Sequence, residues 1–584
     1  MYSHGAQRLD DAQTRFALWA PSCNRVAVEL QGQLPQPMHA EADGWFRLDL
    51  VCQPDASYRF VINEHLRVPD PASRQQAGDV HGFSRLVDHS AYPWRHDDWN
   101  GRTWVETVIY ELHVGLFGGF QQVEEHLAHL AELGVTAVQI MPLGAFPGQR
   151  NWGYDGVLPF APASCYGTPV QLKHLIDRAH GLGLMVFIDV VYNHFGPEGN
   201  YLGLYANSFF RTDRMTPWGA AIDFRRPQVR DFFCENALMW LLDYRCDGLR
   251  LDAVHAIDDD EFLLELASRV RSAVPQPHHV HLVLENENNS ASLLGNGFNA
   301  QWNDDGHNTL HVLLTGEQES YYADYAASPT HNLATFLEQG FVYQGQMNRH
   351  ALPRGEPSGH LPPHAFVLFL QNHDQVGNRA FGERLINISD SDALKAATVL
   401  LLLCPMVPLL FMGEEWGSRR PFLFFSDYRD DLAQAVRDGR RNEFAEFSQF
   451  ANPHTRQQIP DPNAPSTFVR SQPDFALAQR PRQQEWLAFY KDLLHVRRTR
   501  ILPGLEQASS LGTQVIGDGA VLASWRIGGE KILRIAVNLG NQAVRLASAP
   551  PLAERLYAHR ANDDEYRQGL LPTSSALVTL ELLT

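Results

Sequence analysis

The sequence predicts an α/β fold: a (β/α)8 TIM barrel with a β-sandwich on its N-terminal side and a C-terminal β-domain. Three observations lead to this prediction. Short strand-like segments fill the chain up to about residue 90, apolar strands then alternate with amphipathic helices to residue 498, and strand-like segments return after Pro503. Eight alternating strand–helix units are the pattern of a parallel barrel with helices outside it.

The N-terminal segments TRFALWA, RVAVEL, GWFRLDL and SYRFVI are separated by Gly, Pro, Asp or Asn. Short strands with such turn residues between them are typical of a sandwich of two antiparallel sheets. We therefore expect residues 1–92 to form an N-terminal β-sandwich.

The central region contains the expected barrel strands. They are residues 107–113, 137–142, 185–191, 248–252, 281–285, a weak candidate at 298–302, 365–370 and 407–412. The helical stretches VEEHLAHLAELG and VQLKHLIDRAHGLG each end in Gly, a common helix stop, and a helix at 481–498 completes the last unit. Residues 93–502 are the expected catalytic barrel with inserted loops.

The apolar run 396–413 is long enough to suggest a membrane span. Pro405 and Pro408 would break such a helix in its middle. We interpret the run as a buried helix, a turn and a buried strand, and expect no membrane partner. Beyond it, GAVLASWRI and KILRIAVNLG alternate again, which predicts a C-terminal β-sandwich over residues 503–584.

The chain of 584 residues has a net charge of −19 and no evident basic stripe. This charge argues against a nucleic-acid partner and is compatible with a neutral sugar. The N-terminal segment lacks an apolar signal core, so we expect a cytoplasmic protein. Nothing in the sequence indicates the oligomeric state.

Catalytic side chains of such a barrel lie at the C-terminal ends of its strands. Here four strands end in ionisable residues: Asp189 and His194 at the third, Arg250 and Asp252 at the fourth, Glu285 at the fifth, and His373 and Asp374 at the seventh. A single Asp at such a position usually caps the next helix. Four together, with Arg250 two residues before Asp252, instead indicate a site.

Glycosidic cleavage explains this set of residues. It needs one carboxylate that attacks or stabilises an oxocarbenium-like centre, and a second carboxyl group that stays protonated to donate to the leaving oxygen. Arg250 would keep Asp252 ionised, whereas nearby negative charge would raise the pKa of Glu285. Glu287 is an alternative acid, but the apolar strand HLVL runs directly into Glu285.

We expect neither a cofactor nor a metal ion. His278, His279 and His281 lack a spaced carboxylate or Cys that would complete a metal site, and we interpret them as a polar loop before a strand. Asn193 lacks evident acidic partners for a cation.

The motifs DVVYNH, DGLRLD, the strand-end Glu and QNHD occur in this order. They resemble the four signature regions of the α-amylase superfamily. Further segments resemble the maltooligosyltrehalose trehalohydrolases of that superfamily: ELHVGLF (111–117), RNWGYDG (150–156), NHFGPEGNYL (193–202), QWNDDGHN (301–308), LLTGEQESYY (313–322), QNHDQVGNR (371–379) and PFLFFSD (421–427). The resemblance implies a retaining hydrolase that acts on maltooligosyltrehalose or a related α-glucan. It would cleave the α-1,4 bond next to the terminal trehalose and release trehalose.

The resemblance also implies roles for individual residues. Asp252 matches the nucleophile, Glu285 the acid/base, and Asp374 the carboxylate that stabilises the transition state. Substrate-binding roles are expected for Tyr154, Asp189, His194, Arg250, His255, Asp304, Asp305, His307, His373, Gln375 and Asn378. The family pattern leads us to expect His at positions 308 and 428, but this sequence has Asn308 and Tyr428 there.

The loop 192–226 has no clear periodicity, and long loops in compact barrels are usually functional. Its aromatic residues Tyr201, Tyr205, Phe209, Phe210 and Trp218 could stack on sugars or pack against the barrel rim. Two other functions remain open. One is a glycogen branching or debranching enzyme; the other is a catalytically silent glucan-binding protein, against which the presence of all three acids argues.

Overall fold

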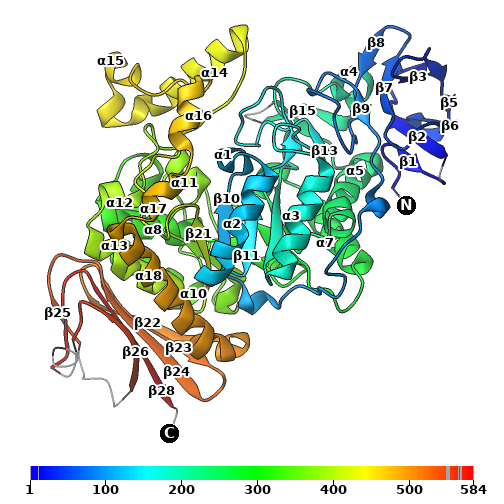
Figure 1. The fold of residues 1–584 in the computed structure, drawn as a ribbon. Coiled ribbons are helices and arrows are strands. Elements are labelled where there is room, and N and C mark those ends of the chain that lie inside the picture. The colour runs from blue at the N-terminus through cyan, green and yellow to red at the C-terminus, as the bar shows by residue number, and fades with distance from the viewer. Residues whose placement is uncertain are drawn as a thin grey trace.

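The computed structural model describes residues 2–10, 12–216, 219–546, 553–562, 565 and 568–582. The chain forms three regions, which Figure 1 shows side by side. A small set of strands at the N-terminal end (blue) lies at one side of a barrel with its helices (cyan to yellow), and a sheet at the C-terminal end (orange to red) lies at the other side.

The N-terminal region contains two antiparallel sheets. One has the order β1-β2-β6-β5 and the other the order β4-β3-β7-β8, with β9 also paired to β7. The strands are β1 Gln7–Arg8, β2 Gln13–Trp19, β3 Val26–Leu30, β4 Gln36–Pro37, β5 His39–Ala40, β6 Trp45–Val51, β7 Ser57–Ile62, β8 Leu66–Val68 and β9 Ser84–Arg85. Alternate residues such as Phe16, Val28 and Phe60 are fully buried between the sheets, as period-two patterning requires.

Eight parallel strands form a closed barrel in chain order, which confirms the predicted fold class. They are β10 Ile109–Leu112, β11 Ala137–Ile140, β14 Met185–Val190, β17 Gly248–Leu251, β18 His281–Leu284, β19 Ala300–Trp302, β20 Phe366–Phe369 and β21 Val407–Phe411. Closure comes from the pairing of β10 with β21, with Ile109 opposite Leu409. All of these strand residues are buried, because helices cover the outside of the barrel and side chains fill its inside.

Helices follow the strands and pack on the outside of the barrel (Figure 1). The longer ones are α2 Phe120–Leu133, α3 Pro169–Gly181, α5 Pro227–Leu238, α7 Asp260–Ala273, α8 Asp304–Thr315, α10 Pro329–Gln339, α13 Ser391–Leu403 and α18 Pro481–Val496. Short elements at the rim are α1 Val114–Phe117, β12 Gly144–Ala145, β13 Leu158–Pro162, α4 Leu202–Tyr205, β15 Phe210–Thr216, β16 Gly219–Ile222, α6 Val254–Ile257, α9 Ala323–Ala326, α11 His373–Gly377 and α12 Leu385–Ile388.

The apolar run at 396–413 is divided between α13 and β21, as predicted from its two prolines. In the part of the chain that the structure describes, no helix is long and apolar enough to cross a membrane.

A helical insertion follows β21 and extends from the barrel beside its rim (Figure 1). It contains α14 Asp430–Glu443, α15 Pro453–Arg456, α16 Pro465–Ser471 and α17 Phe475–Ala478. α18 comes after this insertion and packs on the barrel helices α2 and α13. The last strand–helix connection is therefore far longer than the few residues that such a loop needs.

The C-terminal region contains a five-stranded antiparallel sheet, β22-β23-β24-β28-β26, and a two-stranded ribbon, β25-β27. Their bounds are β22 Ser509–Gly517, β23 Ala520–Ile527, β24 Lys531–Asn538, β25 Val544–Arg545, β26 Glu554–His559, β27 Leu570–Leu571 and β28 Ser575–Leu582. The sheet contacts α10 and α13 of the barrel. Because a 3-10 helix, η12 Leu502–Gln507, precedes β22, we propose that this domain begins at residue 508 rather than 503.

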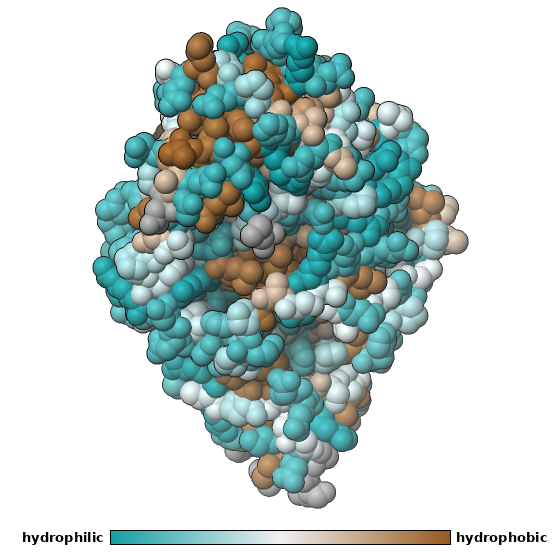
Figure 2. All heavy atoms as spheres, turned by 90° about the vertical axis from the view of Figure 1, so that its right-hand side faces the viewer, coloured by the Kyte–Doolittle hydropathy of each residue, from teal (hydrophilic) through white to brown (hydrophobic). Residues whose placement is uncertain are grey.

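Figure 2 shows the side of the molecule that carries the N-terminal strands. Hydrophilic residues cover most of it, and hydrophobic residues gather in its upper part and in a band across its middle. Scattered apolar groups on a mostly polar surface are ordinary for a folded domain.

Candidate active site

A cleft of about 490 Å³ opens at the C-terminal ends of the barrel strands. Its walls come from strand ends and from the segment between β19 and β20. The lining residues are Trp152, Tyr154, His194, Asp252, Ala253, His255, Glu285, Glu287, Asp304, Asn308, Tyr321, Asp324, Tyr325, Asn348, Arg349, His350, Arg354, Asp374, Gln375, Asn378 and Phe424. The three expected catalytic carboxyl groups therefore share one cavity.

Asp252 follows β17 directly and is held on both of its carboxylate oxygens. Arg250 donates to Oδ1 at 2.7 Å, and the side-chain amide of Asn193 donates to Oδ2 at 2.8 Å. Arg250 is fully buried and also donates to Asp189 at 2.8 Å. Burial raises the pKa of Asp189 to about 7, although Arg250 acts in the opposite direction. Asp252 is thus held in a fixed orientation with one oxygen paired to a cation.

Glu285 follows β18 in a different environment. Its Oε2 accepts a hydrogen bond of 2.5 Å from the backbone N–H of Ala253, and it lies 3.6 Å from Arg250. Burial and the negative charge of Asp252 raise the pKa of Glu285, although Arg250 acts in the opposite direction. Ala253 has a left-handed φ of +42°, which is a strained conformation for any residue other than glycine. This conformation directs the backbone N–H of Ala253 toward Glu285.

Glu287 also lines the cleft, but its side chain is 69% exposed and lies 3.8 Å from His255. β18 ends at Leu284, so the strand does not continue to this position. Glu287 is therefore exposed to solvent at the edge of the cleft, whereas Glu285 lies in the buried environment expected of a protonated acid.

Asp374 lies in the first turn of α11. Its Oδ2 lies 3.3 Å from Nε2 of His373, and its Oδ1 accepts from the amide of Asn378 at 3.3 Å. Burial alone would raise the pKa of Asp374, but the positive charge and hydrogen bond of His373 outweigh it and lower the pKa. Asp374 is therefore a carboxylate at neutral pH.

Tyr154 forms part of the floor of the cleft. Its ring stacks on His373 with centroids 5.0 Å apart, and its hydroxyl donates to Asp189 at 2.7 Å. His194 lines the cleft beside it and bonds the Tyr154 carbonyl through Nε2 at 2.9 Å. Gly153, which precedes Tyr154 in the chain, has a φ of +108°, and a Cβ there would lie 2.3 Å from the Pro142 carbonyl oxygen. The turn that places Tyr154 therefore requires glycine.

Four further residues expected to bind substrate line the cleft: His255, Asp304, Gln375 and Asn378. Gln375 donates to Asp304 at 3.3 Å. Burial, together with the negative charges of Glu285 and Asp374, raises the pKa of Asp304 to about 8. The charges of Glu285 and Asp374 therefore act on Asp304, which faces the open cleft.

Asp305 and His307 do not line the cleft, which corrects the expectation that they bind substrate. Asp305 is fully buried and accepts hydrogen bonds from the backbone N–H groups of Val342 and Tyr343 at 2.8 and 3.0 Å. His307 is buried and bonds the Leu370 carbonyl at 2.8 Å. Both lie on α8, where neighbouring residues point in directions about 100° apart.

The helical period also shows which residues of this motif face the substrate. Asp304 and Asn308 are four residues apart on α8, so they share a face, and both line the cleft. Asp189, Arg250 and His373 differ again: they are buried beneath the cleft and do not line it. Their contacts are with Asp252, Asp374 and Tyr154, which they hold in place from below the cleft.

Sequence reasoning missed several residues of the site. Glu111, at the end of the first barrel strand, is fully buried and accepts hydrogen bonds from His373. Asn193 orients Asp252. Tyr321, Tyr325 and Arg354 line the cleft from the segment between β19 and β20. A polar residue at a strand end could have indicated Glu111, whereas nothing periodic marks the loop residues.

The aromatic residues of the loop 192–226 pack against other residues instead of facing the cleft. Tyr205 and Phe209 are buried, and Phe209 contacts Phe232 with ring centroids 5.4 Å apart. Of the four that lie in the described part of the chain, none lines the cleft, and Trp218 lies outside the described residues. Tyr428 is also buried away from the cleft. Among the described residues, no group of three or more His, Cys, Asp or Glu is arranged to hold a metal ion.

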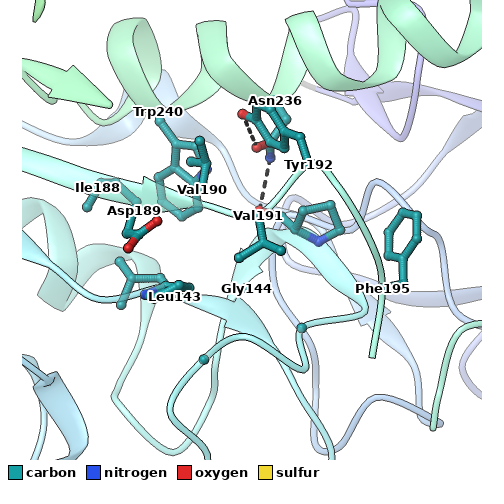
Figure 3. A pocket seen from close by; sticks show the side chains of 14 residues that line it. Leu143, Gly144, Ile188, Asp189, Val190, Val191, Tyr192, Phe195, Asn236 and Trp240 are labelled. Carbon is teal, nitrogen blue, oxygen red and sulfur yellow. Dashed lines mark hydrogen bonds between the residues drawn. The ribbon is translucent and has the colours of Figure 1, made fainter. Parts of the chain in front are cut away.

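Two other hollows lie near the cleft. One of about 390 Å³ shares Tyr321 and Asn378 with it and has Phe444, Phe447 and Phe450 in its wall. The other, shown in Figure 3, is a cavity of only about 30 Å³ behind β14, where Asn236 accepts a hydrogen bond from Tyr192 at 2.7 Å. A space of that size holds a water molecule but not a sugar.

Comparison with known proteins agrees with this geometry. The α-amylase catalytic domain family matches residues 90–208, and a C-terminal domain family of unknown function, DUF3459, matches residues 508–578. The malto-oligosyltrehalose trehalohydrolase of Deinococcus radiodurans is 41% identical over 96% of this chain and 93% of its own length. That of Saccharolobus solfataricus is 37% identical over 84% of this chain and 86% of its own.

Solved structures show the same fold. A Salmonella typhimurium crystal structure, named as a candidate α-amylase, is 43% identical with a TM-score of 0.93 and covers 99% of this chain and 100% of its own. A pullulanase from Anoxybacillus, solved with maltotetraose, has a TM-score of 0.73 at 16% identity, with 99% of this chain and 87% of its own covered. The second likeness concerns the fold alone.

Proposed function

Because this chain belongs to the malto-oligosyltrehalose trehalohydrolases of the α-amylase family, we propose that it hydrolyses the α-1,4-glucosidic bond next to the terminal trehalose of maltooligosyltrehalose. Free trehalose is the product, so the reaction is a step of trehalose biosynthesis. The observation that carries the proposal is the cleft in which Asp252, Glu285 and Asp374 meet. Their environments differ as glycosidase chemistry requires.

Asp252 is the nucleophile of the proposed first step. Its carboxylate attacks the anomeric carbon of the glucose whose bond is cleaved, and the bond from that carbon to the glycosidic oxygen breaks. Glu285 gives its proton to this oxygen, so trehalose leaves as a neutral alcohol. Asp374, held as a carboxylate by His373, stabilises the positive charge that develops on the sugar.

The second step regenerates the enzyme. Glu285, now ionised, takes a proton from a water molecule, and the resulting hydroxide attacks the anomeric carbon and releases Asp252. Two inversions at the same carbon retain the α configuration. We therefore expect the carboxyl groups of Asp252 and Glu285 to lie about 5–5.5 Å apart.

The test compares two substrates of equal length. Incubated with maltotriosyltrehalose, the enzyme is expected to release trehalose with a kcat/KM several orders of magnitude above that for maltopentaose. A site built on hydrogen bonds can discriminate by about 10⁴–10⁵, whereas shape alone gives roughly 10–200-fold. Equal values would contradict trehalose specificity, and a branched glucan product would indicate a branching enzyme.

Product stereochemistry tests the mechanism separately. NMR of the fresh glucan product is expected to show the α-anomer first, because the proposed intermediate on Asp252 requires retention. The β-anomer as the first product would contradict the role of Asp252 as nucleophile.

A further inference from the structure

Two buried ionisable groups, Glu111 and His373, support Asp374 from below the cleft. Glu111 at the end of β10 accepts two hydrogen bonds from His373, from the backbone N–H at 2.9 Å and from Nδ1 at 2.7 Å. The other ring nitrogen of His373 lies 3.3 Å from Asp374. Glu111 and His373 are both fully buried, so these contacts lead from the barrel interior to the cleft.

The two carboxylates beside the His373 ring favour its positive charge. An ionised carboxylate only accepts hydrogen bonds, and a neutral imidazole has only one N–H to donate. Nδ1 donates to Glu111 at 2.7 Å and Nε2 lies 3.3 Å from Asp374, so the imidazolium ion is the form with an N–H toward each carboxylate. Burial disfavours the cation, but Asp374 and Glu111 outweigh this effect and raise the pKa of His373 well above its ordinary value.

Few other charged groups act on His373. Tyr154 covers one face of its ring, and Trp152 and Trp302 contact it with centroids 5.8 and 5.9 Å away. The remaining titratable and charged neighbours are His113 on the β10 side, Asp189 at the end of β14, and Arg250 on β17. Burial lowers the pKa of His113 to about 4, so it is neutral. Arg250 is paired with Asp189 and Asp252, which leaves Glu111 and Asp374 as the direct counter-charges of His373.

We propose that Glu111 is a positioning residue for the reaction: it holds His373 as an imidazolium ion that faces Asp374 and so fixes the negative charge of Asp374 in the transition state. Glu111 touches no substrate and acts only through His373. This inference rests on the proposed function, since it assumes that Asp374 must be ionised for hydrolysis.

Glu111→Gln tests the proposal. The amide has one acceptor and one NH₂ donor, so it cannot accept both hydrogen bonds from His373. When its oxygen accepts from the backbone N–H, its NH₂ faces Nδ1, and the ring becomes neutral with its proton on Nε2. We expect kcat to fall roughly 10- to 100-fold, the range found when the outer-shell partners of metal-bound histidines are removed, while KM changes little.

The pH profile distinguishes this role from a purely structural one. Without the cation, the pKa of Asp374 rises, so Asp374 becomes protonated at a higher pH than in the wild type. The acid limb of the kcat/KM profile is then expected to move up by about one pH unit. Glu111→Asp keeps the charge and is expected to restore the position of this limb, even with reduced kcat.

Glu415→Gln is the matched control. Glu415 is equally buried and accepts from the hydroxyl of Tyr110, the neighbour of Glu111, at 2.9 Å, but it does not contact His373. This variant is expected to lose stability with an unmoved acid limb. An unmoved acid limb in Glu111→Gln as well, with kcat lowered only in proportion to folded enzyme, would overturn the proposal.

A measurement on the wild-type enzyme needs neither substrate nor a folded variant of Glu111. With ¹⁵N-labelled histidine, and His373 assigned by its absence in His373→Asn, both ring nitrogens are expected to show imidazolium shifts at pH 7. A neutral ring would overturn the inference while the trehalose-release assay still supports the proposed function. Failure of trehalose release with an imidazolium present would contradict the proposed function alone.

Discussion

The two walls of the catalytic cleft are built from different kinds of structure. One wall carries Asp252, Glu285 and Asp374, each placed at or just after the end of a barrel strand. The other comes from the long segment between β19 and β20, with Tyr321, Arg354 and their neighbours. The strand-end wall holds the three carboxyl groups proposed to cleave the bond, and the loop wall forms the other side of the cleft.

The walls also differ in how their side chains are held. On the strand-end wall, Asp252 and Asp374 each have a buried cation, Arg250 and His373 respectively. Beneath the loop wall, the buried Asp305 accepts hydrogen bonds from the backbone N–H groups of Val342 and Tyr343 and from other groups. These bonds stabilise the conformation of the segment. Changes on the first wall should therefore affect chemistry, and changes beneath the second should affect folding and substrate binding.

The largest effect is expected on the strand-end wall. Asp252→Asn and Glu285→Gln should each lower kcat at least about 10⁴-fold, because each removes a group that reacts in the proposed mechanism. Both substitutions are near-isosteric at the cleft, so the melting temperature should hardly change. Single-turnover kinetics and thermal unfolding measure the two quantities, and near-normal turnover in Glu285→Gln would contradict its role as the acid.

Beneath the loop wall, Asp305→Ala should lower the free energy of unfolding by about 3–5 kcal/mol. The substitution leaves the buried N–H groups of Val342 and Tyr343 unpaired and removes the partner of Arg354, which lies 3.2 Å from Asp305. Urea unfolding measures the loss. Asp304→Asn, one residue away on the cleft side, is the control and should unfold like the wild type; equal losses for both would remove the distinction between the two faces of α8.

Asp304 lies where the two walls meet, and Asp304→Asn should leave the basic pH limb nearly in place. Glu285 must be protonated to act as the acid, so activity is lost as the pH rises through its pKa. Because burial and the charges of Glu285 and Asp374 raise the pKa of Asp304 to about 8, Asp304 is mostly protonated at neutral pH, and a neutral amide replaces it without a change of charge. The basic limb of kcat/KM should therefore move by less than about 0.5 pH unit. A basic limb that moves down by a full pH unit would show that Asp304 is ionised beside Glu285.

The smallest effect is expected at Glu287, on the exposed edge of the cleft. Its side chain is well solvated, and surface substitutions usually change stability by less than about 0.5 kcal/mol. Glu287→Gln should therefore keep kcat and stability close to wild-type values, measured beside Glu285→Gln. Loss of activity in Glu287→Gln alone would reverse the assignment of the acid.

The strand-end wall is the part of the cleft that could be predicted from the sequence. All eight barrel strands were predicted, including the weak one that became β19, because buried parallel strands are short apolar runs with helices between them. The position of Asp252, Glu285 and Asp374 at one rim follows from the same parallel arrangement. Regular secondary structure therefore carried the correct predictions.

The wrong predictions concern contacts between segments that are distant in the chain. Asp305 and His307 stand in a polar motif after a strand, but their partners Val342 and Leu370 come from elsewhere. Two interpretations were open for the loop aromatics, and Tyr205 and Phe209 follow the second, because they pack into the core. No local pattern distinguishes a polar or aromatic residue that faces the cleft from one that a distant segment covers.

Closure of the barrel by β10 and β21 has a consequence for synthesis of the chain. Ile109 pairs with Leu409, three hundred residues later. At ordinary rates of translation, the ribosome therefore needs about 15–60 s after it has made β10 to synthesise the partner strand β21. During that time β10 has an unpaired edge. β21 is the last barrel strand to leave the ribosome, and it follows the apolar helix α13. Exposed strand edges invite wrong pairing. Nascent chains that stop before residue 407 should therefore be the species most prone to aggregate and most dependent on chaperones.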